Sequence, residues 1–357
     1  KYLPHDIVFV MRHVFTVIVI ILCIILLCFS SQSMIGAARG FELFITNVFP
    51  ALFPFTVCVQ AMKLLGIFEV NSNSMLGNTA KIFLLSAAAG SPTGSFLVEA
   101  GFGGSTPKLS KNKRSILSAL CNLSNPVFII GTVAGSMLGR AKLALLFLVS
   151  HYGTASILVL LFTLFNKKNC SCQYSKAIDG CRLSEVLPAA IENAVAVVMK
   201  IGGAIVFFSV VTGMLDGQYI SAIISPKLKT MLCGLLEMTN GISRAAASGT
   251  DLRSSCALIS FMLSFGGICI AVQSMSVAKT QVLPYLITKL VQGLISALVC
   301  FVLFPLFHSG ANAVINGLDS VLLTRNAIAI GEIAACAALT SAAATIIAIL
   351  FTGKTRA

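Results

Sequence analysis

Two short polar interruptions inside apolar stretches carry the residue types best suited to bind a small solute. The first is the run Gly90-Ser91-Pro92-Thr93-Gly94, which breaks the apolar segment Ile82 to Gly104. Its hydroxyl groups and exposed backbone amides suit an anionic or ring-nitrogen ligand; capping of two short helices is the alternative role. The residues predicted here to contact a solute are Ser91, Thr93, Gly94 and Ser95.

The second interruption is Thr239-Asn240-Gly241, within the apolar segment Leu228 to Thr250. Just before it lies Glu237, a carboxylate whose place in an apolar segment is costly unless it is paired or functional. Glu237 could bind a proton or a cation, or pair with Arg244 seven residues later. The residues predicted to form this second part of the site are Glu237, Thr239, Asn240 and Gly241.

Polar residues also occur inside two apolar runs that are long enough to be helices. In the first run a polar cluster precedes Pro126, which loosens the helix and frees backbone carbonyls. In the second, a serine precedes the pair Gly266-Gly267 and a glutamine follows it. Ligand contact and hydrogen bonding between helices are the two roles open to them. The candidates are Asn122, Ser124, Asn125, Ser264 and Gln273, with Glu99, Glu192 and Lys200 as weaker ones.

The amino-acid composition indicates the class of protein that must position these residues. Of 357 residues, 57% are hydrophobic and 10% are charged, whereas soluble domains carry about 25% charged residues. This excludes a soluble enzyme and predicts an all-α polytopic membrane protein. The net charge of +13 is spread over short gaps between apolar runs, as the positive-inside rule requires, so no nucleic-acid partner is expected.

The sequence contains little evidence for a catalytic site or a metal site. The four histidines have no metal-ligand partner at helical spacing, and Gly90 to Gly94 lacks the Gly-Lys-Ser/Thr of a phosphate-binding loop. Cys170, Cys172 and Cys181 form one cluster, but structural metal sites normally use four ligands. We therefore expect reduced thiols, no enzymatic activity, no metal and no cofactor.

Charge-free windows predict about eight transmembrane helices, since a span needs about 20 mostly apolar residues. Ile82 to Gly104 and Leu228 to Thr250 instead predict re-entrant helical hairpins, because a break at membrane depth needs partners other than lipid; a kinked span is the alternative for the second. With a cytoplasmic N-terminus, twice as many Lys and Arg residues fall on the cytoplasmic side. The predicted spans are Val14 to Ala38, Leu43 to Met62, Ser115 to Gly139, Leu143 to Asn166, Glu185 to Leu215, Ser254 to Ala278, Leu290 to Leu318 and Ile333 to Gly353.

The two hairpins belong to an internal repeat. Arg114 and Arg253 each open a span 139 residues apart, and Asn125 and Ser264 follow at the same offset. Both halves predict the order span, hairpin, span, span, and they start on opposite sides, which makes them inverted repeats. The predicted units are an N-terminal helix (1–40), a first repeat (41–165), a cytoplasmic loop (166–184), a second repeat (185–307) and a C-terminal loop and helix (308–357).

Four motifs in this order resemble a known family. They are GSPTGSFLVEA (Gly90 to Ala100), CNLSNPVFIIGTVAG (Cys121 to Gly135), GLLEMTNG (Gly234 to Gly241) and SFGGICIAVQS (Ser264 to Ser274). The run FPALFPF (Phe49 to Phe55) also fits the family's early span. The chain resembles the sporulation integral membrane protein YlbJ family, whose halves carry the nucleoside-recognition or Gate domain. That family usually has a His two residues before the Gln, where this chain has Ala271, so a proton role of that His is absent.

The resemblance implies an elevator-like, concentrative-nucleoside-transporter-like carrier in the cell or forespore membrane of a spore-forming bacterium. We expect transport of a small anionic or heteroaromatic solute, with dipicolinate as the leading substrate. An ion-coupled nucleoside or nucleobase carrier and a non-transporting component of a spore membrane complex stay open. Besides the lipid bilayer, the expected partners are the anionic solute, a coupling ion (proton or sodium) and a second copy of the chain.

Overall fold

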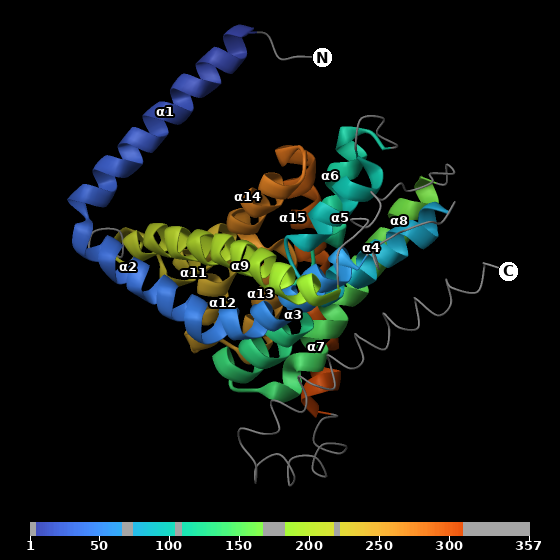
Figure 1. Cartoon of the computed structure of the whole chain (residues 1–357). Coiled ribbons are helices and arrows are strands. Elements are labelled where there is room, and N and C mark those ends of the chain that lie inside the picture. The colour runs from blue at the N-terminus through green and yellow to red at the C-terminus, as the bar shows by residue number, and fades with distance from the viewer. Residues whose placement is uncertain (1–4, 66–73, 104–108, 167–182, 218–221, 310–357) are drawn as a thin grey trace, which may run out of the picture.

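The described residues form a bundle built from helices alone (Figure 1). The computed structural model describes residues 5–65, 74–103, 109–166, 183–217 and 222–309. Helices satisfy their own backbone hydrogen bonds, which is what a hydrocarbon environment demands. The predicted C-terminal span, the cluster Cys170, Cys172 and Cys181 and most of the loop 166–184 lie outside the described residues.

The N-terminal helix α1 (His5–Cys28) stands away from the bundle (Figure 1). Its described apolar side chains are largely exposed, as for Leu27, which is 76% exposed; a helix that is apolar all round faces lipid. The chain then turns by 97° into α2 (Ser30–Leu43). The segment Val14 to Ala38, predicted as one span, is therefore bent at Phe29. Phe29 leaves the helical conformation, and Ser33 Oγ donates to its carbonyl at 2.9 Å, a bond that bends helices.

Helix α2 packs along α9 (Leu183–Met214) through small residues. A methyl group on Gly40 would lie 2.5 Å from Ser209 Cβ, and one on Gly36 would lie 2.8 Å from the Ser209 carbonyl oxygen. Glycines four residues apart let two membrane helices approach at backbone distance. This contact fixes α2 to the second half of the chain.

The same order of elements occurs twice: a long helix, a hairpin, a broken helix and a second long helix. In the first half it is carried by η1 (Phe44–Val48) with α3 (Phe49–Leu64), α4 (Met75–Ala89) with α5 (Thr93–Phe102), α6 (Lys111–Cys121) with η2 (Phe128–Met137), and η3 (Ala141–Leu143), α7 (Ala144–Leu148), η4 (Val149–Gly153) and α8 (Thr154–Phe165). In the second half it is carried by α9, α11 (Pro226–Leu236) with α12 (Met238–Ala247), α13 (Leu252–Phe265) with α14 (Gly267–Val277), and α15 (Val282–Ser309).

Contacts between the halves come in exchanged pairs. Helix α5 packs on α14 of the second half, and its counterpart α12 packs on η2, the counterpart of α14. In the same way α6 packs on α15, and its counterpart α13 packs on η4, which belongs to the segment that corresponds to α15. At the centre Ser124 Oγ donates to the Leu263 carbonyl at 3.2 Å, across the 139-residue offset that separates the two halves in sequence. A residue that contacts its own counterpart lies near the axis relating two copies. The repeat bounds 41–165 and 185–307 stay a prediction.

Four described helices are long and apolar enough to cross a membrane, and the bent pair of α1 and α2 is a fifth candidate. The predicted span Ser115 to Gly139 is instead broken between α6 and η2. The chain is thus a polytopic helical membrane protein, and the number of eight spans stays a prediction. The four helices are Ala141–Phe165, Ser184–Met214, Leu252–Val277 and Val282–Phe307.

Candidate functional site

The second hairpin is closed by glycines. A methyl group on Gly241 would overlap Gly234 Cα, although residues seven apart in a continuous helix lie about 10 Å apart along its axis. Helices α11 and α12 therefore fold back on each other, and a kinked continuous helix does not describe this segment.

The break of this hairpin lies at Glu237, not at Thr239-Asn240-Gly241 as predicted. Glu237 has an extended backbone (φ −145°, ψ 118°), and the three predicted breakers form the first turn of α12. Glu237 Oε1 accepts from Thr239 N at 2.9 Å, and Oε2 accepts from Asn240 N at 2.7 Å. The side chain is 2% exposed. It thus caps α12 with its carboxylate at the positive end of the helix dipole.

The first hairpin turns at Gly90, whose φ of 78° favours glycine. Ser91 Oγ donates to the Leu123 carbonyl at 3.0 Å, and Asn125 Nδ2 donates to the Ala88 carbonyl at 2.8 Å. A methyl group on Gly94 would overlap the Cys121 carbonyl oxygen. These contacts fix the turn against the break between α6 and η2, at residues 122–125.

The break between α13 and α14 is made by Gly266 and Gly267, with φ values of 82° and 80°. It lies against the second hairpin, because a methyl group on Gly267 would lie 3.0 Å from the Leu236 carbonyl oxygen. Two hairpin turns and two helix breaks therefore meet in pairs. Such interrupted backbone is tolerated at membrane depth where it is buried in protein or lines a cavity.

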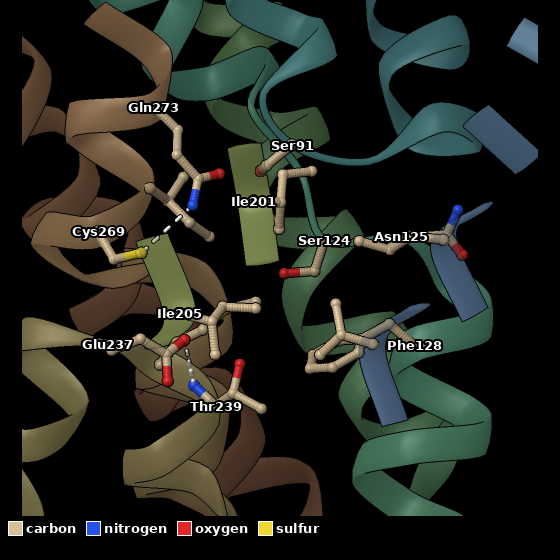
Figure 2. Close-up of a pocket in the computed structure, with 14 residues that line it drawn as sticks. Ser91, Ser124, Asn125, Phe128, Ile201, Ile205, Glu237, Thr239, Cys269 and Gln273 are labelled. Carbon is tan, nitrogen blue, oxygen red and sulfur yellow. Dashed lines mark hydrogen bonds between the residues drawn. The ribbon is translucent and has the colours of Figure 1, made fainter. Parts of the chain in front are cut away.

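A cavity lies where these four interruptions converge (Figure 2). The space between its lining side chains measures about 480 Å³ with its open mouth included. Polar groups come from the interruptions, and an apolar wall comes from η1, α3 and α9. The lining residues are Val48, Leu52, Ser91, Ser124, Asn125, Phe128, Ile201, Ile205, Glu237, Met238, Thr239, Cys269, Ile270 and Gln273.

Comparison with known proteins gives one relative. No family model matches the chain, and no solved structure matches it. The chain is 22% identical over 338 residues to the sporulation integral membrane protein YlbJ of Bacillus subtilis (strain 168). The aligned region covers 80% of this chain and 82% of YlbJ. The chain is a relative of YlbJ. The resemblance inferred from the four motifs is confirmed, and YlbJ and this chain are both integral membrane proteins, here with several membrane-crossing helices.

In this YlbJ relative, the cavity brings together about half of the residues predicted from sequence. Six of them line it, from both hairpins and both broken helices (Figure 2). Among them, the side chain of Gln273 makes the weakest intramolecular hydrogen bond. Its amide nitrogen donates to Cys269 Sγ at 3.3 Å, and sulfur is a weak acceptor. The six are Ser91, Ser124, Asn125, Glu237, Thr239 and Gln273.

Seven predicted residues lie outside the lining, and several of these make structural contacts instead. Asn122 Nδ2 donates to Ser274 Oγ at 2.6 Å and to Tyr285 Oη at 2.7 Å. Asn240 Nδ2 donates to Ser209 Oγ on α9 at 2.7 Å. Gly94 and Gly241 provide the close approaches described above. The seven are Thr93, Gly94, Ser95, Asn122, Asn240, Gly241 and Ser264.

Two buried ionisable residues next to the cavity were missed by the sequence analysis. His151 Nε2 accepts from Ser124 N at 3.1 Å, so neutral His151 carries its proton on Nδ1 and donates it to Ser264 Oγ at 2.8 Å. It thereby joins the two helix breaks. Lys289 was placed just before a span starting at Leu290, whereas α15 begins at Val282 and carries Lys289 two turns inside. An ionisable residue in an apolar run was the available signal for both.

Charged residues gather at the far end of α9. Asp216 accepts from both terminal nitrogens of Arg244, and Arg39 and Lys229 lie 3.3 Å and 3.5 Å from its carboxylate. The alternative pairing of Arg244 with Glu237 was thus wrong. Glu99 similarly pairs with Arg114 at 3.1 Å. The Asp216 cluster ties both arms of the second hairpin to α2 and α9, because Lys229 lies on α11 and Arg244 on α12.

This cluster predicts a pH dependence of stability. Burial alone would raise the pKa of the Asp216 carboxyl, but hydrogen bonds from Arg244 and the charges of Arg244, Lys229 and Arg39 bring the pKa below 3.8. A depressed pKa stabilises the fold above pH 3.8, and that contribution is lost as the pH falls through the lower folded value. We expect Asp216→Asn to lower the free energy of unfolding at pH 7 by about 1 kcal/mol, since the group is partly solvated.

The measurement is thermal unfolding of both proteins in detergent across pH. The difference between Asp216→Asn and the unsubstituted chain should shrink as the pH falls below 3.8 and through the lower pKa of the folded protein. Glu42→Gln is the matched control, because Glu42 is an exposed acid on α2. A difference that persists unchanged at low pH would mean that the ion pairs do not cause it.

Proposed function

We propose that this YlbJ relative is a membrane carrier, and not an enzyme, that moves a small solute through the cavity between its two hairpins. The observation that carries the proposal is the convergence of two hairpin turns and two helix breaks on one cavity. Interrupted helices near the membrane midplane provide backbone groups for substrates in many secondary transporters. A purely structural membrane protein has no need for four such interruptions at one place.

The lining chemistry supports a small planar solute with polar edges. Asn125 and Gln273 provide amides, each with an N–H group left to donate to a carboxylate or a ring nitrogen. The hydroxyls of Ser91 and Ser124 donate to backbone carbonyls and offer their oxygens as acceptors for a polar N–H or O–H of the solute. Phe128, Ile201 and Ile205 form a surface on which a ring can pack. Our leading substrate is pyridine-2,6-dicarboxylate (dipicolinate), which is also the solute implied by the family resemblance, with a role in sporulation as the name of YlbJ states for that protein.

The position of the cavity also supports an elevator-like movement. Its polar side belongs to the hairpins and broken helices, and its apolar side belongs to η1, α3 and α9. A solute held by the hairpins could therefore travel with them along the apolar wall. Proton or sodium coupling belongs to the proposal as an open choice of ion.

A nucleoside is the second candidate substrate, and one observation favours it. The described lining residues include no Lys or Arg, and Glu237 is already bonded to the backbone of α12. Amides and hydroxyls without a cation suit a neutral ribose and base.

Thermal stabilisation of the purified full chain in detergent separates these candidates. Pyridine-2,6-dicarboxylate, a panel of nucleosides and simple dicarboxylates are added at increasing concentration, and binding to the folded state raises Tm. A selective, saturable rise with pyridine-2,6-dicarboxylate supports the leading substrate. A rise with nucleosides alone supports the second candidate, and no response to either would contradict the carrier in favour of a non-transporting component.

Gln273 provides a sharper prediction. We expect Gln273→Ala to weaken binding of the stabilising solute about tenfold, because a lost hydrogen bond to a charged group contributes about 1.5 kcal/mol. The Tm of the solute-free protein should change little, since the amide makes only a weak intramolecular bond to Cys269 Sγ. Ser276→Ala is the control, an exposed hydroxyl on the same helix outside the lining. Equal affinities for both variants would remove Gln273 from the site.

A further inference from the structure

Lys289 is a buried cation within a membrane-crossing helix. It lies in the span Val282–Phe307 and is 1% exposed. Its Nζ donates to the Asn122 carbonyl at 2.7 Å and contacts Gln292 Oε1 at 3.3 Å. Among the described residues, no Asp or Glu lies within ion-pair distance of it. Lys200, which lies within the span Ser184–Met214, is by contrast exposed on α9.

The surroundings of Lys289 leave its charge uncompensated. The ionisable groups that face it are Cys121, His151 and Tyr285, none of them a carboxylate. In the described part of the chain, Asn122 Oδ1 and Gln292 Nε2 are buried atoms without a hydrogen-bond partner. An unpaired ammonium in such a place is costly, and charged residues within spans usually face a functional path. The carbonyl end of α6 offsets part of that cost.

This charge lies directly behind the cavity. The carbonyl it binds belongs to Asn122, the first residue of the break 122–125, and Ser124 and Asn125 of that break line the cavity. Two extended residues span about 7 Å. Glu237, the acid on the other side of the cavity, already accepts bonds from the N-terminus of α12. Lys289 therefore contributes a positive potential to the side of the cavity that faces away from the Glu237 carboxylate.

We propose that Lys289 is the residue that sets the charge preference of this carrier, by favouring carboxylate-bearing solutes over neutral ones. The inference rests on the proposed function and names its substrate class as small carboxylates. Lys289 lies behind the break 122–125, so its charge acts on the solute at a distance and Lys289 does not touch the solute. A unit charge at about 8 Å, at the effective dielectric constant of about 20 that fits protein sites, changes affinity for a monoanion by tenfold or more. A dianion should feel about twice the free-energy effect.

The test compares ligands of one shape and different charge. Isothermal titration calorimetry on the full chain in nanodiscs uses pyridine-2,6-dicarboxylate, pyridine-2-carboxylate and the neutral pyridine-2,6-dicarboxamide. Lys289→Met and Lys289→Gln both remove the charge, and the glutamine can still donate to the Asn122 carbonyl. Lys289→Arg keeps the charge, and Lys200→Met removes an exposed lysine from a span as the matched control. Thermal unfolding selects the variants that stay folded.

We expect Lys289→Met and Lys289→Gln to weaken monocarboxylate binding about tenfold and dicarboxylate binding more strongly. Binding of the diamide should hardly change. Lys200→Met should bind all three ligands as the unsubstituted chain does. A uniform loss for all three ligands would show that Lys289 only supports the helix break, and would overturn the proposal while the cavity remains the site. Preferential binding of the diamide or of nucleosides by the unsubstituted chain would overturn the carboxylate assignment but not the carrier. If the unsubstituted chain bound none of these solutes, the proposed function itself would fail.

Discussion

Replacing Gly94 with alanine is expected to lower the free energy of unfolding by about 3 kcal/mol, the upper range for adding atoms to a packed core. The added methyl group would overlap the carbonyl oxygen and carbon of Cys121 and lie 3.0 Å from the Asn122 nitrogen. These are backbone atoms at the end of α6, so no side-chain rotation can relieve the overlap. The first hairpin must move away from the break 122–125, which should also abolish solute binding.

Gly203→Ala is the matched control for this prediction. Gly203 lies within α9, and nothing is within 4 Å of the position that its methyl group would take. Alanine there should leave Tm unchanged or raise it slightly, since alanine favours helix over glycine by about 1 kcal/mol. The measurement is thermal unfolding in detergent together with solute binding. Equal Tm values for Gly94→Ala and Gly203→Ala would contradict the packing of the first hairpin against α6.

The second large effect is expected at Glu237. Glu237→Ala removes both acceptors of the first turn of α12 and leaves the Thr239 and Asn240 amides without their carboxylate partner. Loss of a helix cap costs about 1 kcal/mol, and each buried unsatisfied donor costs about 1–3 kcal/mol. We expect a total loss of about 3 kcal/mol or more and a displaced second hairpin, because this carboxylate fixes where α12 begins.

Two variants separate the cap from a general effect of charge. Glu237→Asp keeps a carboxylate that is a favoured helix cap, so it should retain most of the stability. Glu192→Ala removes an exposed acid on α9 and should change the free energy of unfolding by no more than about 0.5 kcal/mol. Thermal unfolding of the three proteins side by side provides the comparison. If Glu237→Ala proved as stable as Glu192→Ala, the capping role would be wrong.

Local sequence signals were sufficient for the hairpins but not for the residue at which each one breaks. Glycine and proline at Gly90-Ser91-Pro92 predicted the first turn, and the structure places it there. At the second, the run Thr239-Asn240-Gly241 resembles a helix breaker, yet it is the first turn of a helix because Glu237 accepts from two of its amides. That outcome depends on one side-chain conformation, which residue types alone do not determine.

Contacts between distant segments explain what the sequence could not predict. Lys289 meets the Asn122 carbonyl across 167 positions, and Asp216 meets Arg39 across 177. Periodicity and composition describe one segment at a time, so they show that a lysine lies in an apolar run but not what it faces. For the same reason the polar side chains of Asn122 and Ser264 looked like site residues, whereas they join helices to each other.

Solute uptake into proteoliposomes is the most direct test of a carrier with its site at this cavity. The purified full chain is reconstituted and labelled pyridine-2,6-dicarboxylate is added outside, with proton and sodium gradients imposed in turn. The account predicts saturable uptake that falls strongly in Gln273→Ala and persists in Ser276→Ala. Uptake that is equal in both variants, or absent from correctly folded and reconstituted protein that binds the solute, would contradict it.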